Sequence, residues 1–165
     1  MFFISAYDLH WMENTNETED LCLHGHVIVK IGDESFEYNA TVSSTALYLL
    51  KSLKEEHIIN QQNQMLPCCG FFMIPNKDLS KVDILGCPNG IDWSVRHEND
   101  KIILITESGA ITEIPQTQYR ETVFAFADQI EAFYKSSSPK VLPNDDFERN
   151  GYIAFWNEWN SIRYE

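Results

Sequence analysis

The spacing of apolar side chains changes along the chain, and this change constrains the fold more than any other feature. Between residues 2 and 115, most segments alternate apolar with polar side chains, as strands do. From residue 116 onward, apolar residues recur three and four positions apart, as on one face of a helix. We therefore predict a single α+β domain over residues 1–165, with a mainly antiparallel sheet and helices packed on one face.

The clearest strand pair surrounds Gly32 and Asp33, a dipeptide typical of a tight turn. Val27 and Val29 share one face of the first strand, whereas His24 and His26 lie on the other. A later meander of three strands is also predicted, with turns between them. The segments expected to be strands are 2–9, 24–31, 34–42, 91–98, 101–107 and 110–115, with a short strand or buried loop within 65–76.

Helical spacing predicts helices over 43–58, 116–137 and 144–165. Ser43 or Ser44 is expected to cap the first helix and Asn144 the last, because their side chains accept hydrogen bonds from free backbone N–H groups. Apolar residues on the three inward faces are Ala46, Leu49, Leu50 and Leu53; Tyr119, Val123, Phe126, Ile130 and Phe133; and Tyr152, Phe155, Trp156 and Trp159.

The charge is strongly negative, with 25 acidic against 12 basic side chains and a formal net charge of −13. Such a field repels a phosphate backbone, so we expect no nucleic-acid partner. No apolar run approaches the roughly 20 residues that span a bilayer, and the first residues carry no basic segment of a signal peptide. We therefore predict a cytoplasmic protein that does not bind membranes and whose four cysteines are reduced.

Cys22, His24 and His26 occupy alternate positions, so a strand would place them on one face. Zinc usually takes four N or S ligands, and Cys68, Cys69 or Cys87 could complete such a set. Strand neighbours two apart are separated by roughly 6.6 Å, and no C-x-x-C pair supports them. We expect an ordinary strand with exposed histidines, and neither a metal nor a cofactor.

Cys68 and Cys69 are adjacent, with apolar flanks at Leu66, Pro67, Phe71 and Phe72. Burial among such residues raises a thiol pKa, so small core residues are expected rather than a nucleophile. The alternative is a cysteine- or metal-dependent enzyme in which Cys68 or Cys69 works with His24, His26, His57 or His97. Asp92, beside Trp93, is a further candidate catalytic residue, because its carboxylate could lie in a cleft. No phosphate-binding, hydrolase or zinc-protease motif is present, so we predict no enzymatic activity.

Two acidic clusters are the strongest candidate site. Glu13, Glu17, Glu19 and Asp20 lie in a segment with no Lys or Arg between Met1 and Val29. Asp145 and Asp146 open the last predicted helix, where acids also complement the helix dipole. An acidic surface favours a basic protein partner and speeds its association. Exposed aromatic residues beside the acids would add anchors: His10 and Trp11 adjoin the first cluster, and Trp156 and Trp159 lie two to three turns beyond the second.

Four stretches resemble a group of small bacterial immunity proteins encoded beside polymorphic or contact-dependent growth inhibition toxins. They are LHGHVIVKIGDESFEYNATVSSTALYLLKSL (23–53), QMLPCCGFFMIPN (64–76), GCPNGIDWSV (86–95) and NGYIAFWNEW (150–159). The resemblance covers most of the chain and implies a non-catalytic protein that binds a cognate toxin domain, commonly a nuclease with a basic cleft. It transfers no catalytic residues. A homo-oligomer formed through the C-terminal helix is a third possibility.

Overall fold

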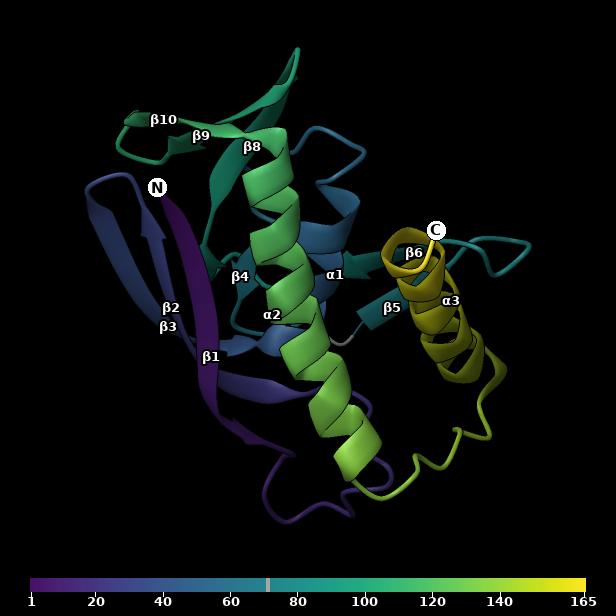
Figure 1. Cartoon of the computed structure of the whole chain (residues 1–165). Coiled ribbons are helices and arrows are strands. Elements are labelled where there is room, and N and C mark those ends of the chain that lie inside the picture. The colour runs from purple at the N-terminus through teal and green to yellow at the C-terminus, as the bar shows by residue number, and fades with distance from the viewer. Residues whose placement is uncertain (71) are drawn as a thin grey trace.

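The computed structural model describes residues 1–70 and 72–165, in which three helices and ten strands form an α+β fold (Figure 1). All strand pairs of the described sheets are antiparallel. The predicted fold class is therefore confirmed, with the strands divided among four small sheets. The strands are β1 (Phe2–His10), β2 (His24–Ile31), β3 (Glu34–Thr41), β4 (Leu66–Pro67), β5 (Phe72–Pro75), β6 (Val82–Leu85), β7 (Gly90–Ile91), β8 (Trp93–Glu98), β9 (Lys101–Thr106) and β10 (Ile111–Pro115).

The first sheet has the order β1-β2-β3, and its hairpin turns where the sequence predicts. Gly32 adopts a φ of +61°, which glycine reaches without a steric penalty. Val27 and Val29 are fully buried, while His24 and His26 point to the half-buried opposite face. The second sheet, β8-β9-β10, is the predicted meander, and Ile102 and Leu104 contribute to the core.

Helix α1 (Val42–Lys51) is buried on all sides from Val42 to Leu50, rather than along one stripe. Its polar residues find partners there: Ser43 Oγ accepts a hydrogen bond from Leu23 N at 3.1 Å, and Ser44 Oγ donates one to Gly70 O. The predicted cap at Ser43 or Ser44 is wrong, because the helix begins after Thr41 and these hydroxyls serve tertiary contacts. The helix also ends earlier than residue 58.

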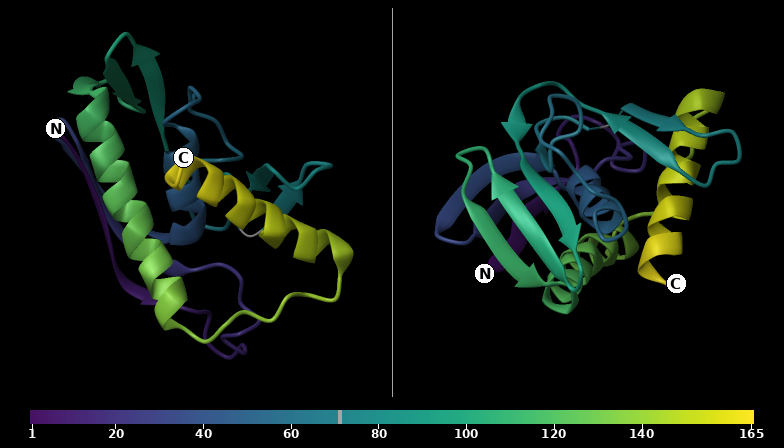
Figure 2. Two further views of the ribbon diagram at one scale, coloured as in Figure 1. Left: turned by 45° about the vertical axis from the view of Figure 1, so that its right-hand side comes forward. Right: turned by 90° about the horizontal axis from the view of Figure 1, so that it is seen from above.

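Helices α2 (Gln116–Ser136) and α3 (Asp146–Arg163) cover different parts of the molecule. Helix α2 lies along β1, where Gln129 Nε2 donates to Ala6 O at 2.6 Å. Helix α3 and the β5–β6 pair stand together at one side, away from the β8–β10 sheet (Figure 2). Asp145, not Asn144, caps α3 by accepting a hydrogen bond from Glu148 N at 2.9 Å. The predicted inward faces are confirmed at Tyr119, Val123, Phe126, Ile130, Tyr152, Phe155 and Trp159, which are all buried.

No helix of the described residues combines the length and apolarity required to cross a membrane. Every major element contributes buried residues to the described core. Helix α1 lies at its centre, with the sheets on one side and α2 and α3 on the other. This arrangement brings the segment between β1 and β2, the strand β5 and the start of α3 to the same region of the surface.

Candidate functional site

The two predicted acidic clusters converge on one cavity of about 630 Å³, which we call the acidic–apolar cavity. Its walls come from the β1–β2 connection, from β5 and from the start of α3. Four carboxylates and no lysine or arginine lie among the lining residues. The acids are Glu19, Asp20, Asp145 and Glu148.

The other wall of this cavity is apolar and exposed. Met12, Phe72 and Phe147 keep 49%, 52% and 43% of their surface accessible. The rings of Phe72 and Phe147 lie 5.6 Å apart, although the residues are 75 positions apart in the sequence. Exposed apolar side chains that gather beside polar ones are typical of binding surfaces. The cavity therefore offers both an apolar contact and negative charge.

Backbone and side-chain hydrogen bonds hold the β1–β2 connection in place. Asp20 Oδ2 accepts from Met12 N at 2.7 Å, and Asp20 Oδ1 accepts from Cys22 N at 3.2 Å. Val141 N donates to Thr18 O at 2.8 Å, which ties this wall to the segment that precedes α3. The Asp20 carboxylate is thus committed to the loop, whereas the exposed Glu19 side chain makes no hydrogen bond to the described residues.

Of the six predicted partner-binding residues, Glu19, Asp20 and Asp145 line the cavity. Glu13, Glu17 and Asp146 lie outside its lining, and Asp146 forms an ion pair with Arg149. Met12, Phe72, Phe147 and Glu148 also line the cavity and were not among the predicted partner-binding residues. Glu148 belongs to the acidic run at the start of the last helix and Phe147 lies between acids in DDFER, so both carried a signal in the sequence.

The tryptophans near the acidic clusters are not exposed. Trp159 is fully buried, as its place on the inward face of the last helix predicts, so it offers no anchor. Trp156 and Trp11 are partly buried, and the Lys140 ammonium lies 3.1 Å from the Trp11 ring centroid. Cation–π contacts of this kind stabilise the fold rather than leave an aromatic surface open. Exposed phenylalanines, rather than these tryptophans, lie beside the acids of the acidic–apolar cavity.

His24 forms part of the cavity wall, with its Nε2 3.5 Å from Asp20 Oδ2. Burial lowers the pKa of His24, although Asp20 opposes this effect. The neighbouring Cys22 is a protonated thiol at neutral pH, because burial raises its pKa to about 12. It is therefore a poor nucleophile, whereas the lowered pKa keeps the His24 imidazole neutral.

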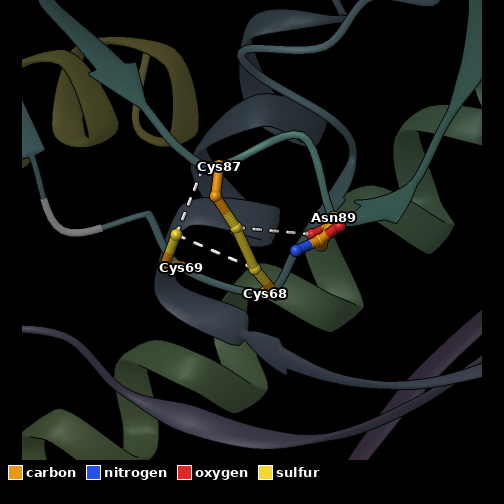
Figure 3. Close-up of a disulfide and its surroundings, with 4 residues drawn as sticks. All are labelled: Cys68, Cys69, Cys87 and Asn89. Carbon is orange, nitrogen blue, oxygen red and sulfur yellow. Dashed lines mark hydrogen bonds between the residues drawn. A yellow bond between two sulfur atoms is a disulfide. The ribbon is translucent and has the colours of Figure 1, made fainter.

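Among the described residues, Cys22 and the histidines do not gather with the other cysteines into one cluster of ligand atoms. His26 Nδ1 lies 2.7 Å from Asn39 Oδ1, and His97 Nε2 lies 2.9 Å from Ser52 O. The prediction that every cysteine is reduced is wrong for Cys68 and Cys87, which form a disulfide (Figure 3).

Within the described part of the chain, the close group of metal-ligating side chains comprises Cys68, Cys69 and Cys87, with no histidine. The three cysteines are half-buried rather than core residues, and Phe71 lies outside the described residues. A thiol paired with a histidine base, as the enzyme alternative requires, is not found in this group.

A second cavity, of about 690 Å³, lies at the C-terminal end of α1, and we call it the polar cavity. His57 in its wall donates through Nε2–H to Asp92 Oδ1 at 2.7 Å. Asp92 also accepts from Asn60 N and Met65 N, each at 3.0 Å, and its side chain is fully buried. This predicted candidate carboxylate therefore organises the 57–65 segment and does not face the solvent.

Comparisons of the chain with family models, curated proteins and solved structures found no match. The chemistry of the cavities is thus the basis for a functional assignment. The acidic–apolar cavity can accept a cationic group through its carboxylates, and the apolar stem of that side chain through its phenyl rings.

Proposed function

We propose that this protein is a cytoplasmic immunity or inhibitor protein that binds a basic toxin domain through the acidic–apolar cavity. The supporting observation is that acids from both ends of the chain line one cavity beside exposed phenylalanines. This combination matches a protein surface that presents arginine or lysine next to apolar side chains. The role resembles that of immunity proteins encoded beside contact-dependent growth inhibition toxins, and it requires no catalysis.

The expected contact uses both parts of the cavity. A guanidinium group can form charge-assisted hydrogen bonds with carboxylates and can stack on the ring of Phe72 or Phe147. The net charge of −13 would attract a basic domain over a longer range and raise the association rate. A standard interface covers about 800 Å² on each partner, so the cavity would be the centre of a larger patch.

The test needs a basic toxin domain as partner, to be sought among the genes that neighbour the gene of this protein. Glu19→Lys/Glu148→Lys reverses two acids whose side chains make no hydrogen bond to the described residues. The matched control, Glu107→Lys/Glu121→Lys, makes the same change in net charge at the β9–β10 turn and on α2, at the opposite end of the molecule (Figure 1). Stopped-flow association is measured at low and high salt.

We expect the cavity variant to associate at least about tenfold more slowly than the control at low salt, with a smaller difference at high salt. Equal rates for the two variants would show that the docking surface lies elsewhere. Failure of the wild-type protein to bind the toxin domain or to inhibit it would refute the immunity role.

A further inference from the structure

Cys68, Cys69 and Cys87 form a group that the proposed partner binding does not use. Cys68 and Cys69 follow β4, and Cys87 lies in the turn between β6 and β7. One ligand atom from each lies within 4.8 Å of the others, and all three side chains are half-buried (Figure 3). Thus two chain segments bring the thiols to one accessible point.

The spacing of these residues suits metal coordination. The sulfurs of Cys68 and Cys69 are 3.7 Å apart. Two thiolates bound at about 2.3 Å to one tetrahedral Zn²⁺ would be about 3.8 Å apart. The Cα atoms of Cys68 and Cys87 are 7.0 Å apart, whereas disulfides usually span about 4.4–6.8 Å. The Cα separation of Cys68 and Cys87 is therefore slightly wider than that of most disulfides.

The surrounding backbone holds the three cysteines in place. Cys87 N–H donates to Cys69 Sγ at 3.1 Å, which joins the two chain segments at this point. Cys68 N donates to Asn89 O at 3.2 Å, next to the β4–β7 ladder. A side chain at Gly86 would collide with the carbonyl oxygen of Cys69, so glycine permits the two segments to approach.

We propose that Cys68, Cys69 and Cys87 bind one thiophilic divalent ion, of which Zn²⁺ is the type, when the disulfide is reduced. Two molecules of a small thiol supply two electrons and two protons to the Cys68–Cys87 disulfide, which gives two cysteine thiols, and the two small molecules are joined in one disulfide. Metal binding then releases the thiol protons to solvent. Three sulfur donors favour Zn²⁺ over Mg²⁺ or Ca²⁺ and leave a coordination position for solvent.

This site differs from the one considered in the sequence analysis, because it uses neither Cys22 nor a histidine. It is also independent of the proposed partner. Oxidation to the disulfide and occupation by a metal compete for the same Cys68 and Cys87 sulfurs. The oxidised protein is therefore expected to bind no metal at this point.

The experiment compares the reduced full-length chain with three variants under anaerobic conditions. Alkylation and mass measurement first verify that the disulfide has been opened. Zn²⁺ is then added, excess metal is removed by gel filtration, and affinity is measured by competition with a chromophoric chelator. Cys69→Ser and Cys87→Ser each remove one donor, whereas Cys22→Ala removes the buried thiol outside the group. Circular dichroism checks that each variant is folded.

We expect one Zn²⁺ per chain in the reduced wild type and in Cys22→Ala. Cys69→Ser should lose at least about tenfold in affinity, and reoxidised wild type should retain no metal. Cd²⁺ in place of Zn²⁺ should give a thiolate-to-metal absorption band that weakens in Cys87→Ser. Reduced wild type without retained Zn²⁺, or Cys69→Ser with unaltered affinity, would overturn the site.

Discussion

An aspartate lies beside a histidine at each cavity, but the two pairs differ in how many hydrogen bonds they make within the fold. His57 lines the polar cavity, and the fully buried Asp92 behind it lies 2.7 Å from His57 and also accepts two backbone hydrogen bonds. In the acidic–apolar cavity, His24 Nε2 lies 3.5 Å from Asp20, and it is buried without a hydrogen-bond partner among the described residues.

This difference separates a structural site from a binding site. A fully buried carboxylate is stable only when its hydrogen bonds are made within the fold, and Asp92 meets that condition. Glu19 and Glu148 lie at an exposed apolar surface, and their side chains make no hydrogen bond to the described residues. Their charges remain available to a partner, so the acidic–apolar cavity is the better candidate for recognition.

The largest expected effect is on stability in the polar cavity. Asp92→Ala leaves His57 and the backbone N–H groups of Asn60 and Met65 without their acceptor. Breaking such a buried network should lower the free energy of unfolding by about 3–5 kcal/mol, as measured by urea denaturation. Asp83→Ala, an exposed carboxylate lining the same cavity, is the control and should change it by less than about 0.5 kcal/mol. Similar losses for both variants would contradict the structural role of Asp92.

In the acidic–apolar cavity the main effect should instead be on binding. Phe147→Ala removes an exposed ring, so the free energy of unfolding should change by less than about 0.5 kcal/mol. Affinity for the toxin domain should fall by about 2 kcal/mol, or roughly 30-fold, as expected for an aromatic anchor. Leu85→Ala, an exposed apolar residue of the polar cavity, should leave affinity unchanged, as measured by calorimetry. A loss of stability without a loss of affinity in Phe147→Ala would reverse the comparison.

The sequence predicts a feature well when the residues that form it are close together in the chain, and poorly when they come from distant segments. Strands and helices follow from nearby periodicity, and the hairpin at Gly32 was predicted at the correct position. Glu19 and Asp145 were predicted as site residues because charge clusters are visible in the sequence. The contact of Phe72 with Phe147 arises only when α3 packs on β5.

Burial of polar residues and pairing of cysteines are equally non-local. Ser43 and Ser44 resemble cap residues in the sequence, but their hydroxyls bond Leu23 and Gly70, which come from other segments. The disulfide joins Cys68 to Cys87 across the β4–β7 ladder. Local patterns carry no information about either partner, so these features became apparent only with the tertiary structure.

A smaller effect is expected where α3 meets the wall of the acidic–apolar cavity. A Cβ atom at Gly151 would lie 2.5 Å from Met73 O and 2.9 Å from Met73 Cβ. Gly151→Ala should therefore destabilise the protein by about 1–2 kcal/mol, although alanine gains about 1 kcal/mol in helix propensity. Asn160→Ala, at an exposed position of the same helix, should be neutral or slightly stabilising. Thermal denaturation distinguishes the two, and a more stable Gly151→Ala would show that α3 does not pack closely on β5.

The smallest expected effect tests the unsatisfied His24 itself. Burial lowers the pKa of His24 from its ordinary 6.5, so the unfolded chain binds a proton more readily than the folded chain. Stability should therefore be highest above pH 6.5 and should fall as the pH drops from 6.5 toward the folded pKa. His24→Gln should flatten this part of the stability–pH profile, measured by urea denaturation at closely spaced pH values. His26→Gln, two residues along β2 and hydrogen-bonded to Asn39, should retain it. Parallel profiles for wild type and His24→Gln would mean that His24 is protonated as easily in the fold as in water. The His24–Asp20 pair would then not differ from the His57–Asp92 pair in the way argued above.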